Sequence, residues 1–91
     1  MKYRKKPVII EAFEVDLLLT NIVEKVPTIP EWFLRAKETG DAIINNDSVS
    51  LKMLEGWMIA GRGNYIIQGV KGEIYSCRGD IFVQTYEPVK D

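Results

Sequence analysis

The chain has 91 residues, enough for one domain spanning residues 1–91 and too few for two. Its 46% apolar and 27% charged residues are typical of a globular protein, and its net charge of −1 supplies no long-range field to attract a polyanion. Histidine is absent and Cys77 is the single cysteine, which excludes an intrachain disulfide, a thiolate zinc site and the commonest general base. We therefore expect a protein that needs no metal or cofactor and is not an enzyme.

The sequence contains no segment that predicts a membrane span or an export signal. No apolar run approaches the ~18 residues that a membrane-spanning helix needs. Basic residues open the chain, but the apolar residues 8–10 are followed at once by Glu11, so the apolar core of a signal peptide does not develop. We expect the protein to stay inside the cell that makes it and not to bind membranes.

The first part of the chain predicts a strand and then a short helix. Residues 8–13 are mostly apolar and begin with three β-branched residues, and Pro7 suits the first position of a strand, where no amide donor is needed, so we expect a strand over residues 8–14. Apolar residues then recur at positions 18, 22 and 26, which predicts a helix with one apolar stripe. That helix must end before Pro27, because a residue that precedes proline is disfavoured in the helical region.

The clearest predicted helix covers residues 30–39. Pro30 suits the first helical position, and Glu31 places a negative charge in the first turn, where the helix dipole favours it. Gly40 can adopt the left-handed conformation that ends a helix. The apolar stripe that this helix would bury consists of Trp32, Phe33 and Ala36.

From residue 41 onward the sequence predicts short strands joined by tight turns. Residues 42–44 and 49–53 flank the turn-forming residues 45–48, and residues 65–68 and 73–77 flank the glycine-containing turn 69–72. Two further strands are expected at residues 57–59 and 81–86. Helices followed by a run of strands indicate an α+β fold. We expect one or two short helices packed on a curved antiparallel sheet, or small half-barrel, of about six short strands.

Three features that could carry chemistry have simpler structural interpretations. The Gly61-Arg62-Gly63 segment lacks the third glycine and the following helix of a dinucleotide site, so its glycines are expected to serve a turn. Cys77 has no histidine to activate it and is interpreted as a small apolar side chain. The basic cluster of Lys2, Arg4, Lys5 and Lys6 is interpreted as a solvated leader before a charged edge strand.

The turn at residues 61–64 is nevertheless the best candidate for a binding site. It places Arg62 between two glycines, where the guanidinium can reach a carboxylate or another anion. If residues 65–68 pair with 73–77, this turn and Arg78 lie at the same end of the hairpin, and Lys71 lies at the other end. The predicted binding residues are Arg62, Asn64, Tyr65 and Arg78, with no catalytic or metal-binding residue.

The order of several motifs along the chain indicates a family. Lys-Lys-Pro-Val-x-x-Glu-Ala lies within residues 1–13, Pro-Glu-Trp-Phe occupies 30–33, and Leu-Glu-Gly occupies 54–56. Residues 65–89 contain Gly-Val-Lys-Gly-Glu and end with Tyr-Glu-Pro-Val. Together they resemble, over nearly the whole chain, a family of small proteins of unassigned function encoded by tailed bacteriophages and prophages. The resemblance implies a bacterial host cytoplasm and no mechanism.

The chain departs from that family pattern at two places. The family usually has Pro-Gly-Asp where this sequence has Arg62-Gly63-Asn64, and an amide cannot accept a proton as a carboxylate does. A chemical role of that aspartate would therefore not carry over to Asn64. Residues 17–26 are also atypical of the family.

Three hypotheses about function follow. The first is a non-catalytic accessory protein that binds a host or phage protein, or a second copy of itself as a homodimer, through exposed strand edges. The second is a nucleic-acid-associated protein that uses the basic N-terminus, although strong nucleic-acid binding is not expected at this net charge. The third is a small-molecule binder or unusual enzyme at the glycine loops.

Overall fold

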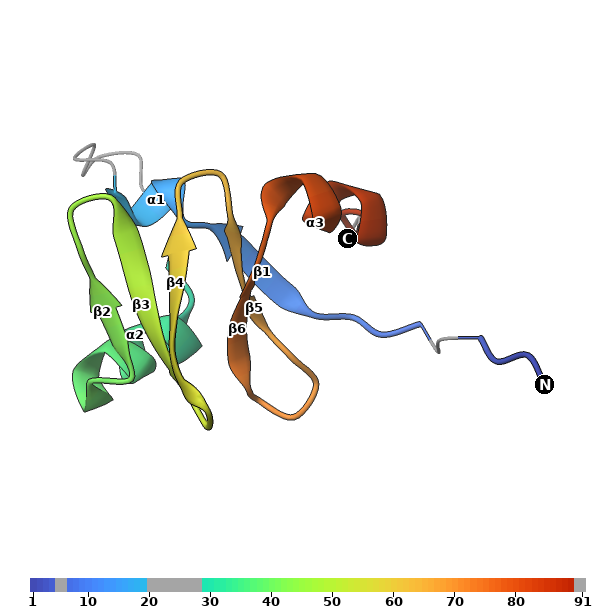
Figure 1. Cartoon of the computed structure of the whole chain (residues 1–91), viewed down its shortest axis with the longest axis horizontal. Helices are drawn as coiled ribbons and strands as arrows, with labels where there is room; N and C mark the ends of the chain where they lie inside the picture. Colours follow the sequence, from blue (N-terminus) through green and yellow to red (C-terminus); the bar gives the residue numbers. More distant parts are fainter. Residues whose placement is uncertain (5–6, 20–28, 90–91) are drawn as a thin grey trace.

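The computed structural model describes residues 1–4, 7–19 and 29–89, and within them the chain forms two three-stranded antiparallel sheets and three short helices (Figure 1). In chain order, the elements are β1 (Glu11–Glu14), α1 (Asp16–Leu19), α2 (Glu31–Thr39), β2 (Ala42–Ile44), β3 (Ser48–Met53), β4 (Gly56–Gly61), β5 (Tyr65–Gln68), β6 (Ile74–Cys77) and α3 (Gly79–Thr85). The predicted α+β fold is confirmed.

The two sheets lie side by side and do not close into a barrel. One sheet has the strand order β1-β5-β6 and the other has the order β2-β3-β4. They meet where β4 runs next to β6 (Figure 1), and there the Ser76 hydroxyl lies 2.9 Å from the Met58 sulfur. The first sheet joins β1 to β5 across more than fifty residues of sequence, so its formation depends on long-range pairing.

Helix α2 closes the core between the two sheets. Phe33 is fully buried, and its ring meets that of Phe13 edge to face with 5.2 Å between ring centroids. Trp32 packs beside them, as the apolar stripe predicted. Pro30 is the N-cap, and Gly40 ends the helix with a φ of 84° while its N–H bonds to the last turn. The predicted boundaries of this helix are therefore confirmed to within one residue. The remaining buried side chains of the cluster are Val15, Ala42, Val49, Leu51, Ala60 and Ile66.

The strand predicted at residues 81–86 is wrong, because this segment forms most of α3. Phe82 lies within α3 and Tyr86 is the residue that caps its C-terminus, and their rings lie 5.0 Å apart. The Phe82 ring stacks on that of Tyr65 in β5, and this contact holds the segment as a helix despite its β-branched residues. Asp80 supplies a side-chain oxygen that accepts a hydrogen bond from the N–H of Ile81 in the first turn.

Helices α2 and α3 pack on opposite faces of the β1–β5 pair, because Phe13 meets Phe33 of α2 and Tyr65 stacks on Phe82 of α3. Tyr65 lies across from Glu14, and the buried Ile67 lies across from Ala12, so these residues share the face that α3 covers. Phe13, one residue out of phase with them, points to the opposite face and into the core. Ala12 and Phe13 therefore point to opposite faces of β1, the first toward α3 and the second into the core.

Two other predicted elements differ in extent from the observed ones. The strand expected at residues 8–14 is paired only over β1, and residues 7–10 form an extended segment that precedes the ladder. The helix expected at residues 18–26 begins at Asp16 as α1, and residues 20–26 of that prediction lie outside the described residues.

Candidate interaction surface

The predicted site residues come from two segments that meet at one end of the first sheet. Tyr65 is paired with Cys77, which places the 61–64 turn and Arg78 at the same end of the β5–β6 hairpin, as expected. The two segments touch, because a Cβ atom at Gly79 would collide with the carbonyl oxygen of Gly63. The sequence therefore predicted correctly that these two segments meet.

The two arginines in these segments bind different carboxylates of the chain. The Arg62 guanidinium lies 3.3 Å from an oxygen of Asp47, in the turn between β2 and β3. The Arg78 guanidinium lies 2.9 Å from an oxygen of Asp80, in the first turn of α3. Both pairs are exposed to solvent. Because each guanidinium already faces a carboxylate, the two do not converge on a shared anion site.

Asn64 has a structural role through its backbone. Its carbonyl oxygen accepts a 2.9 Å hydrogen bond from the N–H of Val15, and its own N–H donates to the carbonyl of Gly61. The neighbouring N–H of Gly63 donates to a carboxylate oxygen of Asp16 at 2.7 Å. These bonds fix the 61–64 turn to the end of β1 and the start of α1.

Tyr65 is the predicted site residue that lines a hollow of the surface. Its ring stacks on that of Phe82 with centroids 3.9 Å apart and planes 8° apart, and the Tyr86 ring follows at 5.0 Å from Phe82. Its hydroxyl donates a 3.4 Å hydrogen bond to Glu14. Partial burial and, next, the negative charge of Glu14 raise the pKa of Tyr65 above its usual value of 10.0. The tyrosine is therefore neutral at physiological pH.

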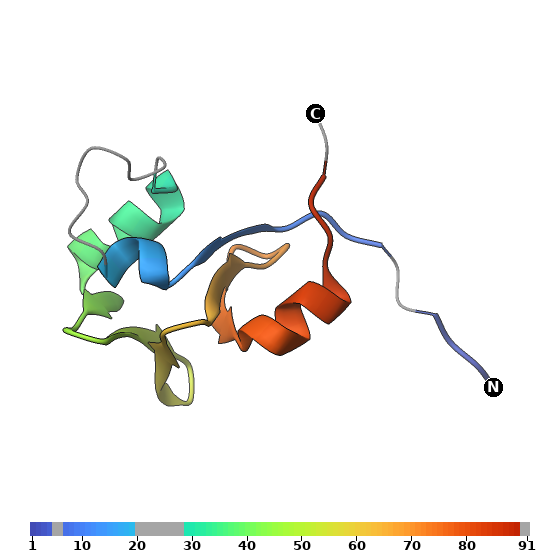
Figure 2. The ribbon, with the colours of Figure 1, turned by 90° about the horizontal axis from the view of Figure 1, so that it is seen from above.

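The hollow beside this aromatic stack is an apolar groove of about 530 Å³. We call it the α3 groove. One wall is the extended segment of residues 7–10, which we call the arm, and the other wall is α3 with the chain that follows it. Figure 2 shows the segment after α3 crossing the arm. The lining side chains include Val8, Ile9, Ile10, Val83 and Val89, and four of these five are exposed at 45% or more.

The strand that borders the groove has one unpaired edge. β1 lies at the end of its sheet and pairs on one side only, with β5. The N–H of Val15 bonds to the carbonyl of Asn64, so the backbone groups of Val15 face β5. Because the direction of the backbone groups alternates along a strand, those of Phe13 and Glu11 also face β5. Those of Ala12 and Glu14 therefore face outward. Among the described residues, none outside β1 forms a backbone hydrogen bond with these groups.

The arm continues this unpaired edge. Residues 7–10 run on from β1 as extended chain away from the body of the molecule (Figures 1 and 2). In an extended chain the outward direction alternates, so Ile10 and Val8 present backbone groups on the same side as Ala12. Pro7 belongs to the other set of alternate residues, whose backbone groups face away from this edge. Its missing N–H therefore removes no donor from the outward side. Within the described part of the chain, Val8, Ile10, Ala12 and Glu14 thus present outward a row of backbone donors and acceptors with no backbone partner.

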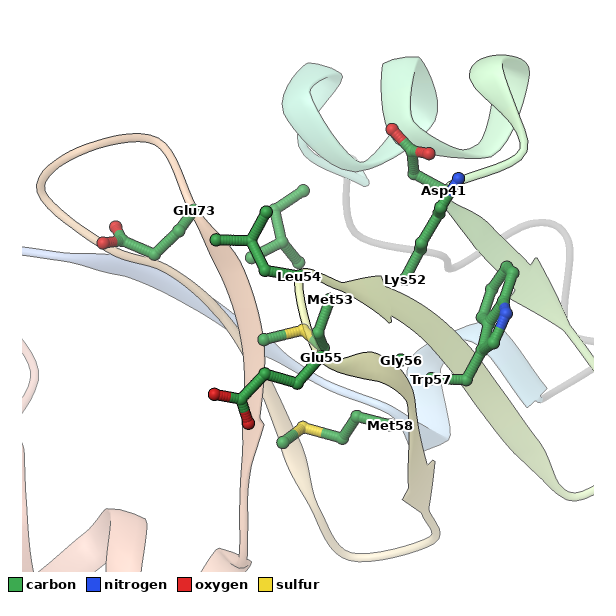
Figure 3. A pocket seen from close by; sticks show the side chains of 10 residues that line it. Asp41, Lys52, Met53, Leu54, Glu55, Gly56, Trp57, Met58 and Glu73 are labelled. Atoms are coloured by element: carbon green, nitrogen blue, oxygen red, sulfur yellow. The ribbon is translucent and has the colours of Figure 1, made fainter.

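A second hollow of about 810 Å³ lies at the far end of the molecule, between the β3–β4 turn and β6 (Figure 3). Its floor is apolar, with Met53, Met58 and Ile74, and charged side chains at its rim include Lys52, Glu55 and Glu73. Trp57 is half exposed beside Lys52, its partner across the β3–β4 ladder. In residues 1–4, 7–19 and 29–89, no three acidic or cysteine side chains are grouped as metal ligands. This hollow therefore has an apolar floor and a charged rim, and the described residues that line it form no group of metal ligands.

The basic N-terminal cluster is only partly within the described residues. Lys2 and Arg4 are exposed, and Lys5 and Lys6 lie outside the described residues. No helix among the described segments is long and apolar enough to cross a lipid bilayer.

Comparison of the chain with known families, proteins and structures found no match. No family model matches the chain, and no significant match was found among curated proteins or among solved structures.

Sequence reasoning identified Tyr65 but not the surface to which it belongs. The arm, the open edge of β1 and the α3 groove depend on which strand pairs with β1 and on α3 being a helix. The available signal was Pro7 at the start of a β-branched run with Glu11 and Glu14, which is typical of an edge strand that is protected by charge.

Proposed function

We propose that this protein is a non-catalytic binding module that adds an extended segment of another polypeptide to the free edge of β1 and the arm. The observation that carries this proposal is the outward row of unpaired backbone groups from Val8 to Glu14, placed beside an apolar groove. An added strand gains affinity from main-chain hydrogen bonds and specificity from side chains that enter neighbouring pockets. The partner is a host or phage protein in the bacterial cytoplasm, in line with the family that the sequence resembles.

The side chains along the edge support this mode of binding. Val8, Ile10 and Ala12 are in phase with one another and lie on the side of the sheet that α3 covers. The alternate side chains of an added strand would lie next to these three, along the α3 groove. Burial of exposed Val8 would then add an apolar contribution to the backbone hydrogen bonds.

The alternative functions have less support from specific contacts. A nucleic-acid surface needs arginines or lysines that converge on phosphates, whereas Arg62 and Arg78 are each paired with an aspartate of the chain. An enzyme needs a nucleophile or base set among converging polar groups, whereas the larger hollow has an apolar floor with dispersed charges at its rim.

The proposal can be tested by photo-crosslinking in bacterial cells with p-benzoylphenylalanine at Val8. We expect discrete adducts with a polypeptide partner, and none of comparable yield with the same group at fully exposed Leu54 on the β3–β4 turn. Ile10→Pro removes one outward-facing N–H and should abolish the adducts. The matched control, Ile9→Pro, removes an N–H of the opposite phase and should retain them. Adducts that form equally at Leu54, or that are insensitive to Ile10→Pro, would contradict strand addition at this edge.

A further inference from the structure

The charged side chains along the free edge and its groove are all acidic. Residues 8–14 contain no lysine or arginine, and their two carboxylates, Glu11 and Glu14, are exposed. Glu87 is the one charged residue among the described residues that line the α3 groove. The chain before the arm runs toward the N-terminus and away from the body of the molecule (Figure 1). The edge therefore presents negative charge beside apolar surface.

The two edge carboxylates have only neutral donors beside them. Glu11 accepts a 3.4 Å hydrogen bond from the indole N–H of Trp32, and Glu14 accepts one of 3.4 Å from the hydroxyl of Tyr65. The ion pairs among the described residues all involve other carboxylates. Opposite charges that face each other across two strands stabilise the pairing, and like charges destabilise it. The edge therefore favours an added strand that brings cations to these two positions.

We infer that the polypeptide that binds this edge is a basic, amphipathic β-strand. Its lysine or arginine side chains lie opposite Glu11 and Glu14. Its apolar side chains lie opposite the in-phase residues Val8, Ile10 and Ala12. This inference rests on the proposed function, because it gives the chemistry of the segment that the same edge binds.

The direction of the added strand sets the order of these side chains. All strand pairs in the described part of the chain are antiparallel, and an antiparallel ladder is slightly more stable per residue than a parallel one. In an antiparallel partner, the residue opposite Glu14 comes first, the residue opposite Glu11 comes fourth and the residue opposite Val8 comes seventh. The bound segment therefore has the order basic-x-apolar-basic-apolar-x-apolar, where x is any residue that suits a strand.

The two basic residues of this pattern lie on opposite faces of the enlarged sheet. The first lies beside Glu14 on the face that α3 covers, together with the three apolar residues. The second lies beside Glu11 on the face of Trp32. The backbone groups of Glu11 face β5, so the residue opposite it forms a pair without hydrogen bonds, in which the side chains are closer together. Both faces of the edge therefore contribute to the selection of a basic strand.

Two synthetic heptapeptides test this assignment by titration into the isotope-labelled full-length protein at low ionic strength. Lys-Thr-Val-Lys-Val-Thr-Val has the assigned pattern, and Glu-Thr-Val-Glu-Val-Thr-Val differs only in charge. Shifts of the Ala12 and Glu14 amide signals in NMR spectra report binding at the edge. The lysine peptide should bind about tenfold more tightly, because both charge pairs are attractive with it and repulsive with the glutamate peptide. Added salt should reduce this ratio, since exposed charges are screened.

Reversing the charge of the edge should reverse the preference. The double variant Glu11→Lys, Glu14→Lys should bind the glutamate peptide more tightly than the lysine peptide, with the Ala12 amide as the reporter. The matched control, Glu38→Lys with Glu55→Lys, changes the net charge equally at two exposed positions outside the edge. It should retain the preference for the lysine peptide. Melting curves check the folding of both variants, and the comparison of the two peptides on the wild type does not depend on them.

Equal affinity of the wild type for the two peptides, or a preference that charge reversal at the edge leaves unchanged, would overturn the basic-strand assignment. If both peptides still shift the Ala12 and Glu14 amides, strand addition at this edge stands and only the assigned charge fails. If neither peptide shifts these amides at millimolar concentration, the assigned pattern is wrong. The adducts at Val8 then decide on the proposed function, which stands if Ile10→Pro abolishes them and fails if they are insensitive to it.

Discussion

Replacing Phe82 with alanine is expected to detach α3 from the first sheet. The Phe82 ring stacks on Tyr65 with centroids 3.9 Å apart and contacts Tyr86, the C-cap residue of α3. The side chain is partly buried, so its loss removes about half of the 1.5–3 kcal/mol that full burial of a phenylalanine contributes. Loss of the stacked pair adds about 0.5–1.5 kcal/mol. The free energy of unfolding should therefore fall by about 2 kcal/mol, which corresponds to ~8–16 °C in a domain of this size.

Urea denaturation followed by circular dichroism and tyrosine fluorescence measures this change. Phe82→Leu, the matched control, retains apolar volume but not the stacked rings, and should lose about 1 kcal/mol. A loss below about 0.5 kcal/mol for Phe82→Ala would mean that α3 is not anchored by this ring, and the α3 groove would then lose its wall.

Three further predictions concern the turn beside α3 and the tyrosines. Gly79→Ala drives a Cβ into the backbone carbonyl of Gly63 and should lower the free energy of unfolding by about 1–3 kcal/mol. Gly61→Ala, where the new Cβ has open space, should lower it much less, and equal melting temperatures of the two variants would contradict the contact. The double variant Arg62→Ala, Arg78→Ala loses two exposed ion pairs and should change stability by less than about 1 kcal/mol in urea denaturation. Burial and a neighbouring tyrosine hydroxyl raise the pKa of Tyr75 from 10.0 to about 12. The stabilisation that protonated Tyr75 contributes is therefore fully present below pH 10 and is lost as the pH rises toward 12. The free energy of unfolding of Tyr75→Phe should fall less over that range than that of the wild type, and an equal fall would refute the assignment.

The elements between residues 30 and 77 could be predicted from local sequence. Pro30 and Gly40 define the limits of α2 because one suits a helix start and the other a left-handed end. Gly63 and Gly72 lie in turns at φ of 82° and 86°, which other residues rarely adopt, so their positions mark where strands end. These signals act within a few residues and are visible in the sequence alone.

Helix α3 could not be predicted in this way. Ile81 and Val83 favour a strand by intrinsic propensity, yet both are exposed on a helix. The conformation is decided by Phe82 and Tyr86, which meet Tyr65 from a different element. A contact between residues far apart in the sequence overrides local propensity, and the sequence pattern does not reveal it.

The site was predicted only in part for the same reason. The β5–β6 hairpin is local, so the meeting of the 61–64 turn with Arg78 followed from the sequence. The carboxylate that pairs with Arg62 is Asp47, which lies next to it because Ser48 pairs with Gly61 at the end of the β3–β4 ladder. The free edge of β1 depends on its pairing with β5, a contact between distant segments that no local pattern specifies.

The alternation of backbone groups along β1 can be measured directly by amide hydrogen exchange in residue-resolved NMR. At low protein concentration, the N–H groups of Phe13 and Val15 should exchange slowly because they face β5, while those of Ala12 and Glu14 should exchange fast. When a partner strand is bound at this edge, the N–H groups of Ala12 and Glu14 should become protected. Ala12 and Glu14 amides that are protected in the isolated chain, or that stay unprotected when a partner strand is bound, would contradict the open edge on which this account depends.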